Sequence, residues 1–146
     1  LYYKDSDAIA EVYGTPWAER MVGLATWTQA GVPVAINSDH MQGMDPDRAM
    51  NSFNPWLMLW IAVARTNEQG DVYGPSQRLA RLAALKTVTT SAAWLEFTEA
   101  DKGTLEVGKL ADLAVIDRDY LTCPTDEIRD IRVLLTMVDG TVVYER

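Results

Sequence analysis

The residues best suited to chemistry in this chain are Asp39 and His40, and the second is the only histidine among 146 residues. They follow the run G-V-P-V-A-I-N-S, residues 31–38, so that an apolar stretch leads straight into a carboxylate. Carboxylates and imidazoles are the usual proton-transferring groups of enzymes. An aspartate just after a strand can equally form an Asx turn or cap a helix, and the local sequence leaves both interpretations open.

The elements before Asp39 predict an alternating α/β fold. Thr15 and Pro16 are a typical helix start, and apolar residues at helical spacing then continue to Gly31, which predicts a helix of about four turns. The run Val32 to Ile36 is apolar on both faces and rich in β-branched residues, which is typical of a strand buried in a parallel sheet. Helix, glycine and buried strand make one step of an α/β fold.

The chain after Asp39 divides into a helical part and a strand-rich part. Asp45 and Pro46 indicate another helix start, and the later pattern predicts helices at 56–65 and 79–88 with a loop at 67–76. From Gly103 onward the pattern predicts a strand pair, 104–107 and 111–116, and then a hairpin of 131–138 and 141–145. The hairpin turn is Asp139–Gly140, a strong two-residue turn signal.

Composition excludes several classes of partner. The net charge is -8 with no run of Lys or Arg, so we expect no binding to nucleic acid or to an anionic membrane. A single cysteine, Cys123, favours a reducing, cytoplasmic location, and no apolar run is long enough to span a membrane. The chain begins without methionine or a signal peptide, so we expect that the true N-terminus is missing.

Three segments together resemble the C-terminal portion of the amidohydrolase superfamily. The most specific is G-T-L-E-V-G-K-L-A-D-L-A-V-I-D at 103–117, which is similar to that family's closing motif G-x-L-x-x-G-K-x-A-D-L-x-x-x-D. The others are G-V-P-V-A-I-N-S-D at 31–39 and I-R-V-L-L-T-M-V-D-G-T-V-V-Y at 131–144. Their order and spacing resemble the branch of metal-dependent hydrolases that includes N-substituted formamide deformylases.

The resemblance implies the C-terminal part of a (β/α)8 TIM barrel plus part of a small β-sandwich. Residues 1–102 would hold the last barrel strand, 32–37, with its flanking helices, and residues 103–146 would belong to the sandwich. Active sites of such barrels lie at the carboxyl ends of the strands. The resemblance therefore implies that Asp39 contacts a divalent metal, with zinc the expected ion, and transfers a proton while a C–N bond of an amide, formamide or cyclic amide is hydrolysed.

The chain lacks the other groups that such a site needs. A catalytic zinc has about three protein ligands, and the histidines that the family supplies from earlier strands are absent. His40 is adjacent to Asp39, and neighbours in an extended chain point to opposite sides, so it is a poor second ligand. His40 and Met41 remain candidates for contact with substrate, or plain loop residues. The family usually has glycine before Ser-Asp and a nearby proline, so the departures at Asn37, His40 and Met41 leave the shape of this loop open.

We therefore expect the 146-residue chain alone to be inactive. Its partners would be a small amide-type substrate and the missing N-terminal part of the barrel, with a homo-oligomer also open. The alternative is a catalytically inert α+β fragment or an interaction module.

Other conspicuous residues favour structural roles. Asp112 is expected to bond nearby backbone amides beside a tight turn at Gly108 and Lys109. A stripe of Phe53, Trp56, Trp60 and Ala64 is typical of a helix face in the core. Cys123 has no basic sequence neighbour that would activate its thiol.

Overall fold

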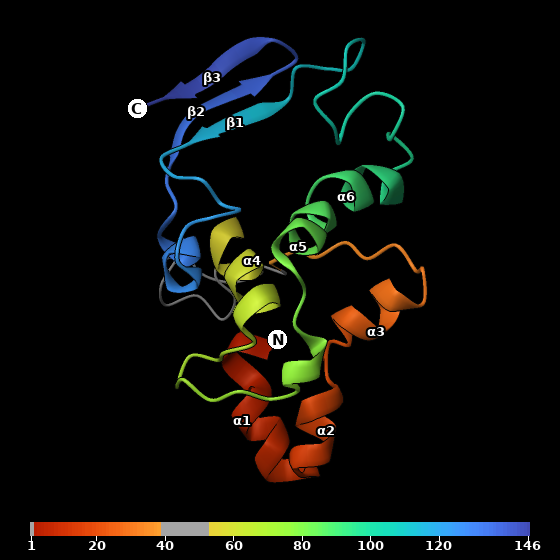
Figure 1. Ribbon diagram of the computed structural model, residues 1–146, viewed down its shortest axis with the longest axis vertical. Coiled ribbons are helices and arrows are strands. Elements are labelled where there is room, and N and C mark those ends of the chain that lie inside the picture. The colour runs from red at the N-terminus through yellow and green to blue at the C-terminus, as the bar shows by residue number, and fades with distance from the viewer. Residues whose placement is uncertain (1, 39–52) are drawn as a thin grey trace.

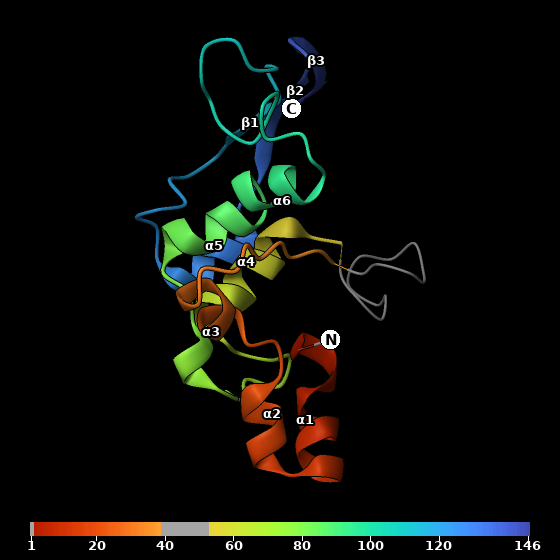
Figure 2. The same ribbon diagram turned by 90° about the vertical axis from the view of Figure 1, so that its right-hand side faces the viewer.

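The computed structural model describes residues 2–38 and 53–146. Figure 1 shows α1 and α2 at one end of the molecule, a small sheet at the other, and the remaining helices between them; Figure 2 keeps that order. The helices are α1 (Tyr2–Tyr13), α2 (Thr15–Arg20), α3 (Leu24–Gln29), α4 (Pro55–Ala64), α5 (Arg81–Thr87) and α6 (Thr90–Leu95), with 3₁₀ helices η1 (Pro75–Gln77) and η2 (Thr125–Asp130). The strands are β1 (Leu113–Ile116), β2 (Val133–Val138) and β3 (Thr141–Glu145).

The core is built around α4. Its sequence P-W-L-M-L-W-I-A-V-A carries no charge, so it can be buried on several sides. Asn54 caps this helix, because its side-chain oxygen accepts a hydrogen bond from the Trp56 N–H at 2.9 Å. The helix predicted at 56–65 is confirmed within one residue at each end. Of the predicted stripe, Trp60 is buried in the core, whereas Phe53 is 52% exposed.

The single helix predicted from Thr15 to Gly31 is wrong, because the chain breaks at residues 21–23 into α2 and α3. Val22 adopts a φ of 51°, in the left-handed region that β-branched residues rarely enter. The carbonyl oxygens of Met21 and Val22 accept hydrogen bonds from the Arg65 guanidinium at 2.9 and 3.1 Å. A residue distant in sequence thus holds a break that local helical spacing does not reveal.

The loop after α4 passes very close to the end of α2 at Gly74. Gly74 has a φ of +61°, and a Cβ placed there would lie 2.1 Å from the carbonyl oxygen of Glu19. Gly74→Ala is therefore expected to lower the free energy of unfolding by about 2 kcal/mol or more, because both the left-handed backbone and the clash oppose a side chain. Chemical denaturation of the two forms measures the difference.

Gly70→Ala is the matched control for Gly74→Ala. Gly70 also has a positive φ, +98°, but nothing lies within 4 Å of a Cβ built there. It should show only the backbone penalty, about 1 kcal/mol. Equal decreases in the free energy of unfolding of the two variants would show that the close approach of Gly74 to α2 does not contribute to the loss.

Residues 32–38 run extended after α3 and lie beside α4. They are assigned to no strand, and among the described residues one backbone hydrogen bond, from Ile36 N–H to Thr87 O at 3.3 Å, ties them to the end of α5. Val34 is buried, and Ile36 packs against the core from a half-buried position. The extended course after Gly31 is as predicted, but the predicted burial on both faces is wrong for Val32, which is 51% exposed. The place of this segment in a parallel sheet stays a prediction.

The sheet is antiparallel, with strand order β1-β2-β3. The predicted hairpin is confirmed as β2 and β3, and its turn residues Asp139 and Gly140 have φ of 47° and 74°. Positive φ at both positions is the requirement of a type I′ turn, which matches the twist of the strands. Asp112 accepts a hydrogen bond from the Asp139 backbone N–H at 2.8 Å, so its predicted role as a partner of backbone amides is confirmed.

The strand predicted at 104–107 is wrong. Residues 104–112 are irregular, and Leu105 is 82% exposed. The predicted turn is present, since Gly108 has a φ of +96° and Lys109 N–H donates to Glu106 O at 3.2 Å. β1 begins only at Leu113 and pairs with β2. Among the described residues no strand pairs with 104–107, so its β-type sequence forms no ladder there.

Residues 117–132 leave the sheet after β1 and return to the helices before β2, where η2 packs on α4 (Figure 1). Tyr120, Ile128 and Ile131 join the core that contains α4. Arg81 of α5 holds this segment by donating to Tyr120 O at 2.6 Å, and the Tyr120 hydroxyl donates to Arg81 O at 3.1 Å. Burial raises the pKa of Tyr120 to about 12.

Candidate active site

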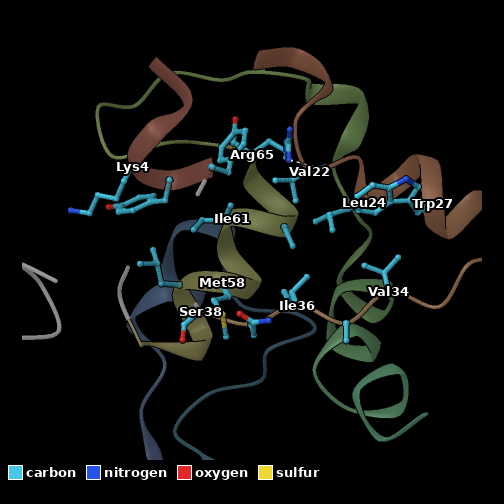
Figure 3. Close-up of a pocket in the computed structure, with 16 residues that line it drawn as sticks. Lys4, Val22, Leu24, Trp27, Val34, Ile36, Ser38, Met58, Ile61 and Arg65 are labelled. Carbon is cyan, nitrogen blue, oxygen red and sulfur yellow. Dashed lines mark hydrogen bonds between the residues drawn. The ribbon is translucent and has the colours of Figure 1, made fainter. Parts of the chain in front are cut away.

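A cavity of about 270 Å³ lies between α1, α3, α4 and the extended residues 34–38. Its apolar walls come from all of these segments, as Figure 3 shows. They include Leu24, Trp27, Val34, Ile36, Met58 and Ile61. Its apolar walls suit an apolar group rather than an ion.

Two cationic side chains, Lys4 and Arg65, lie at one end of the cavity (Figure 3). The Lys4 ammonium is paired with the Glu68 carboxylate, and the Arg65 guanidinium is bound to backbone carbonyls. No carboxylate belongs to the described residues that line the cavity. The described lining therefore provides shape and apolar surface, and both of its cations already have partners.

The predicted catalytic and substrate-contacting residues, Asp39, His40 and Met41, lie outside the described residues. Asn37 and Ser38 line the cavity, so its wall continues to the position immediately before Asp39. The predicted relation between the apolar run and the Asp39 carboxylate stays a prediction. The predicted helix start at Asp45 and Pro46 also lies outside the described residues.

Metal-binding groups do not gather elsewhere in the part of the chain that the structure describes. Residues 2–38 and 53–146 contain no group of three or more His, Cys, Asp or Glu side chains able to hold an ion. Lys109 and Asp112 are not among the residues that line the cavity, and both serve the turns beside the sheet. No described helix is long and apolar enough to cross a membrane.

Cys123 has a basic neighbour that its local sequence does not reveal. Nη1 of Arg81 lies 3.6 Å from the Cys123 sulfur, and Nη2 of the same guanidinium donates to the Cys123 carbonyl oxygen and, at 3.3 Å, to the Thr125 hydroxyl. The sequence showed no basic residue beside Cys123. Arg81 reaches it from α5, which is distant in sequence. Most of these bonds go to oxygens, so the cluster acts as an anchor for the segment after β1.

Arg65 is the residue that the sequence analysis missed. It is 0% exposed, and it is the largest fully buried side chain among the described residues. Its guanidinium lies 4.0 Å from the centre of the Tyr2 ring. One signal was available: Arg65 directly follows an uncharged helix, where a cation interacts favourably with the helix C-terminus.

Comparison with known proteins places the chain in a class of hydrolases. Residues 1–144 match the model of the Amidohydrolase family. The chain therefore belongs to the amidohydrolase family, and the resemblance of its three motifs is confirmed.

The relatives are much longer than this chain. It is 37% identical over 117 residues to the N-substituted formamide deformylase of Arthrobacter pascens, a match that covers 80% of this chain and 20% of that protein. It is 30% identical over 144 residues to the protein LONG AFTER FAR-RED 3 of Arabidopsis thaliana, covering 96% of this chain and 23% of that protein. The chain thus spans about a fifth of the length of the curated relatives it matches.

Solved structures share the fold at lower identity. An amidohydrolase from Thermotoga maritima MSB8 matches with a TM-score of 0.61 and 18% identity, over 99% of this chain and 35% of that one. A prolidase complexed with N-methylphosphonate-L-proline matches with a TM-score of 0.63 and 21% identity, over 100% of this chain and 34% of that one. At these identities the likeness establishes the fold alone.

Proposed function

We propose that this chain is the C-terminal section of a metal-dependent amidohydrolase that cleaves a non-peptide C–N bond in an amide, formamide or cyclic amide. The observation that carries the proposal is the match to the N-substituted formamide deformylase, which extends over 80% of the chain. The prolidase match, at 21% identity, bears on the fold and not on the bond that is cleaved.

In this proposal residues 1–102 belong to the end of a (β/α)8 barrel and residues 103–146 to a β-sandwich. Residues 32–37 would be the last barrel strand, with α3 before them and α4 after them. Their apolar side chains and their packing beside α4 support this position. The strand would then deliver Asp39 to the end of the barrel where active sites lie.

Asp39 is the residue of this chain that we assign to the reaction. Carboxylate oxygen is an ordinary zinc ligand, and the remaining ligands of such a site would come from outside this chain. When bound, a divalent ion lowers the pKa of its water to about 7. Asp39 would hold the ion, accept the proton of the attacking water and return it to the leaving amine. His40 and Met41, the next residues, would contact the substrate.

The partners follow from the same proposal. The exposed apolar side chains of β3, Val142 and Val143, support packing of the sheet against another chain segment, which we propose is the earlier part of the same polypeptide. An assembly of several copies and an inert interaction module are the competing explanations for this surface. Cys123 forms no disulfide, and because free thiols are typical of reducing compartments, we propose a cytoplasmic location for the protein.

The substrate class can be tested with the polypeptide that carries this chain at its native length. The test is release of amine from a matched panel of N-alkylformamides, N-alkylacetamides, a cyclic amide and a proline dipeptide, each with added zinc. We expect turnover of at least one non-peptide amide at a kcat/KM of about 10⁴ M⁻¹s⁻¹, the lower end of the ordinary enzyme range. Cleavage of the dipeptide alone would refute the proposed restriction to non-peptide bonds.

A further inference from the structure

The buried guanidinium of Arg65 is bound almost entirely by backbone. Nη2 donates to Met21 O at 2.9 Å, Nη1 to Val22 O at 3.1 Å and Nε to Tyr73 O at 3.2 Å. The planar guanidinium presents its donors in a fixed fork, and a lysine ammonium cannot reproduce that geometry. The side chain therefore fixes the relative position of the α2–α3 break and the loop after α4.

The charge of Arg65 is compensated by dipoles and an aromatic ring rather than by a carboxylate. Its contacts in the described residues are carbonyl oxygens and the Tyr2 ring, whose centre lies 4.0 Å from the guanidinium carbon. Burial is the main cause that lowers the pKa of Arg65 from its ordinary value, and Tyr2 opposes that shift. A buried cation held this way is costly to disturb. Breaking one of these hydrogen bonds leaves both an N–H of the guanidinium and a backbone carbonyl oxygen without a partner.

The backbone that Arg65 holds is strained. Val22 has a φ of 51°, and Arg65 itself has a φ of 54° at the C-terminus of α4. Non-glycine residues persist in this conformation when surrounding contacts determine it. The Tyr2 hydroxyl reinforces the arrangement, since it lies 2.6 Å from Arg65 O and 2.9 Å from the Tyr73 nitrogen that donates to it.

The held break determines where α3 starts, and α3 leads through Gly31 into residues 32–38. Val22, whose carbonyl oxygen binds Arg65, and Leu24 line the same cavity as Val34 to Ser38. Figure 3 shows Val22 and Leu24 above Val34 and Ile36, with α4 running beside both groups as a further wall. Val22, which Arg65 binds, and residues 34–38 therefore line one cavity.

We propose that Arg65 is a positioning residue for hydrolysis: by holding Met21 and Val22 it sets the direction of α3 and of residues 32–38, the segment that precedes Asp39 in sequence. This inference rests on the proposed function, in which Asp39 handles the proton. Arg65 itself touches neither substrate nor metal. Its effect is expected in kcat rather than in KM, because misplacing a proton-transfer group affects the chemical step.

The test replaces Arg65 by lysine in the native-length polypeptide loaded with zinc. Arg65→Lys keeps the charge and removes the fork, so we expect kcat to fall about tenfold or more with KM within about twofold. Hydrogen exchange should rise in peptides covering residues 21–38. Arg78→Lys is the matched control, because Arg78 donates to a single described carbonyl, Ala64 O at 2.9 Å, near the same end of α4. That variant should leave kcat and exchange unchanged.

An unchanged kcat per folded molecule in Arg65→Lys would overturn the proposal, even if the variant were less stable. If Arg65→Lys does not fold, Tyr2→Phe keeps the guanidinium and removes the hydroxyl that ties Arg65 O; a fall in kcat supports the proposal and an unchanged kcat overturns it. If the unaltered polypeptide hydrolyses no amide, the proposed function fails by itself. Exchange then decides the positioning: a rise confined to residues 21–38 supports it, and no rise overturns it.

Discussion

Replacing Asp39 by asparagine in the native-length polypeptide is expected to reduce kcat/KM for amide hydrolysis by about 10³-fold, within the range for loss of a general acid or base. The amide of asparagine has nearly the same shape as the carboxylate, but it cannot accept the proton of the attacking water. Weaker binding of the metal adds to the loss. Steady-state kinetics with zinc in excess measures it.

The control for Asp39→Asn makes the same change at an exposed aspartate. Asp126 lies on the solvent side of η2, so Asp126→Asn alters the net charge equally and is expected to leave turnover unchanged. Circular dichroism of both variants establishes that folding is intact. Turnover retained by Asp39→Asn, at a level near that of Asp126→Asn, would refute the role assigned to Asp39.

The parts of the fold that the sequence predicted are those set by local chemistry. The Asp139–Gly140 turn needs two residues with positive φ, and that pair is among the few that supply them. The uncharged run of α4 likewise predicts a buried helix without reference to its neighbours. In both cases the residues that make the structure are adjacent in sequence.

The parts that the sequence did not predict depend on distant contacts. The helical spacing of residues 15–30 continues across the break at Val22, and the break exists because Arg65 binds its carbonyls. Leu105 and Val107 have the sequence of a strand but no described strand beside them. A pattern along one segment specifies which face can be buried, and the partner that buries it lies elsewhere.

The candidate site was predictable only in part for a related reason. Asp39 was assigned because an apolar run leads to a carboxylate, and its role stays a prediction; Val34 to Ser38 of that run line the cavity beside α4. Arg65 was not identified, because its role depends on residues about 43 positions away. A local motif can indicate a candidate group, whereas contacts between distant residues, such as those of Arg65, are visible only in the folded structure.

Zinc binding is expected to require more than this chain. A catalytic zinc needs about three protein ligands, and the described residues hold no group of three His, Cys, Asp or Glu side chains. Asp39 and His40 are adjacent, and adjacent side chains in an extended chain point apart. Equilibrium dialysis of the 146-residue chain against micromolar zinc, followed by metal analysis, should therefore find well below one equivalent of zinc.

The native-length polypeptide is the comparison, and it should hold one or two equivalents of zinc. Adding the preceding fragment to the 146-residue chain should restore that amount of bound zinc. Stoichiometric zinc on the folded 146-residue chain would contradict the ligand count, because it would mean that this chain supplies enough ligands by itself.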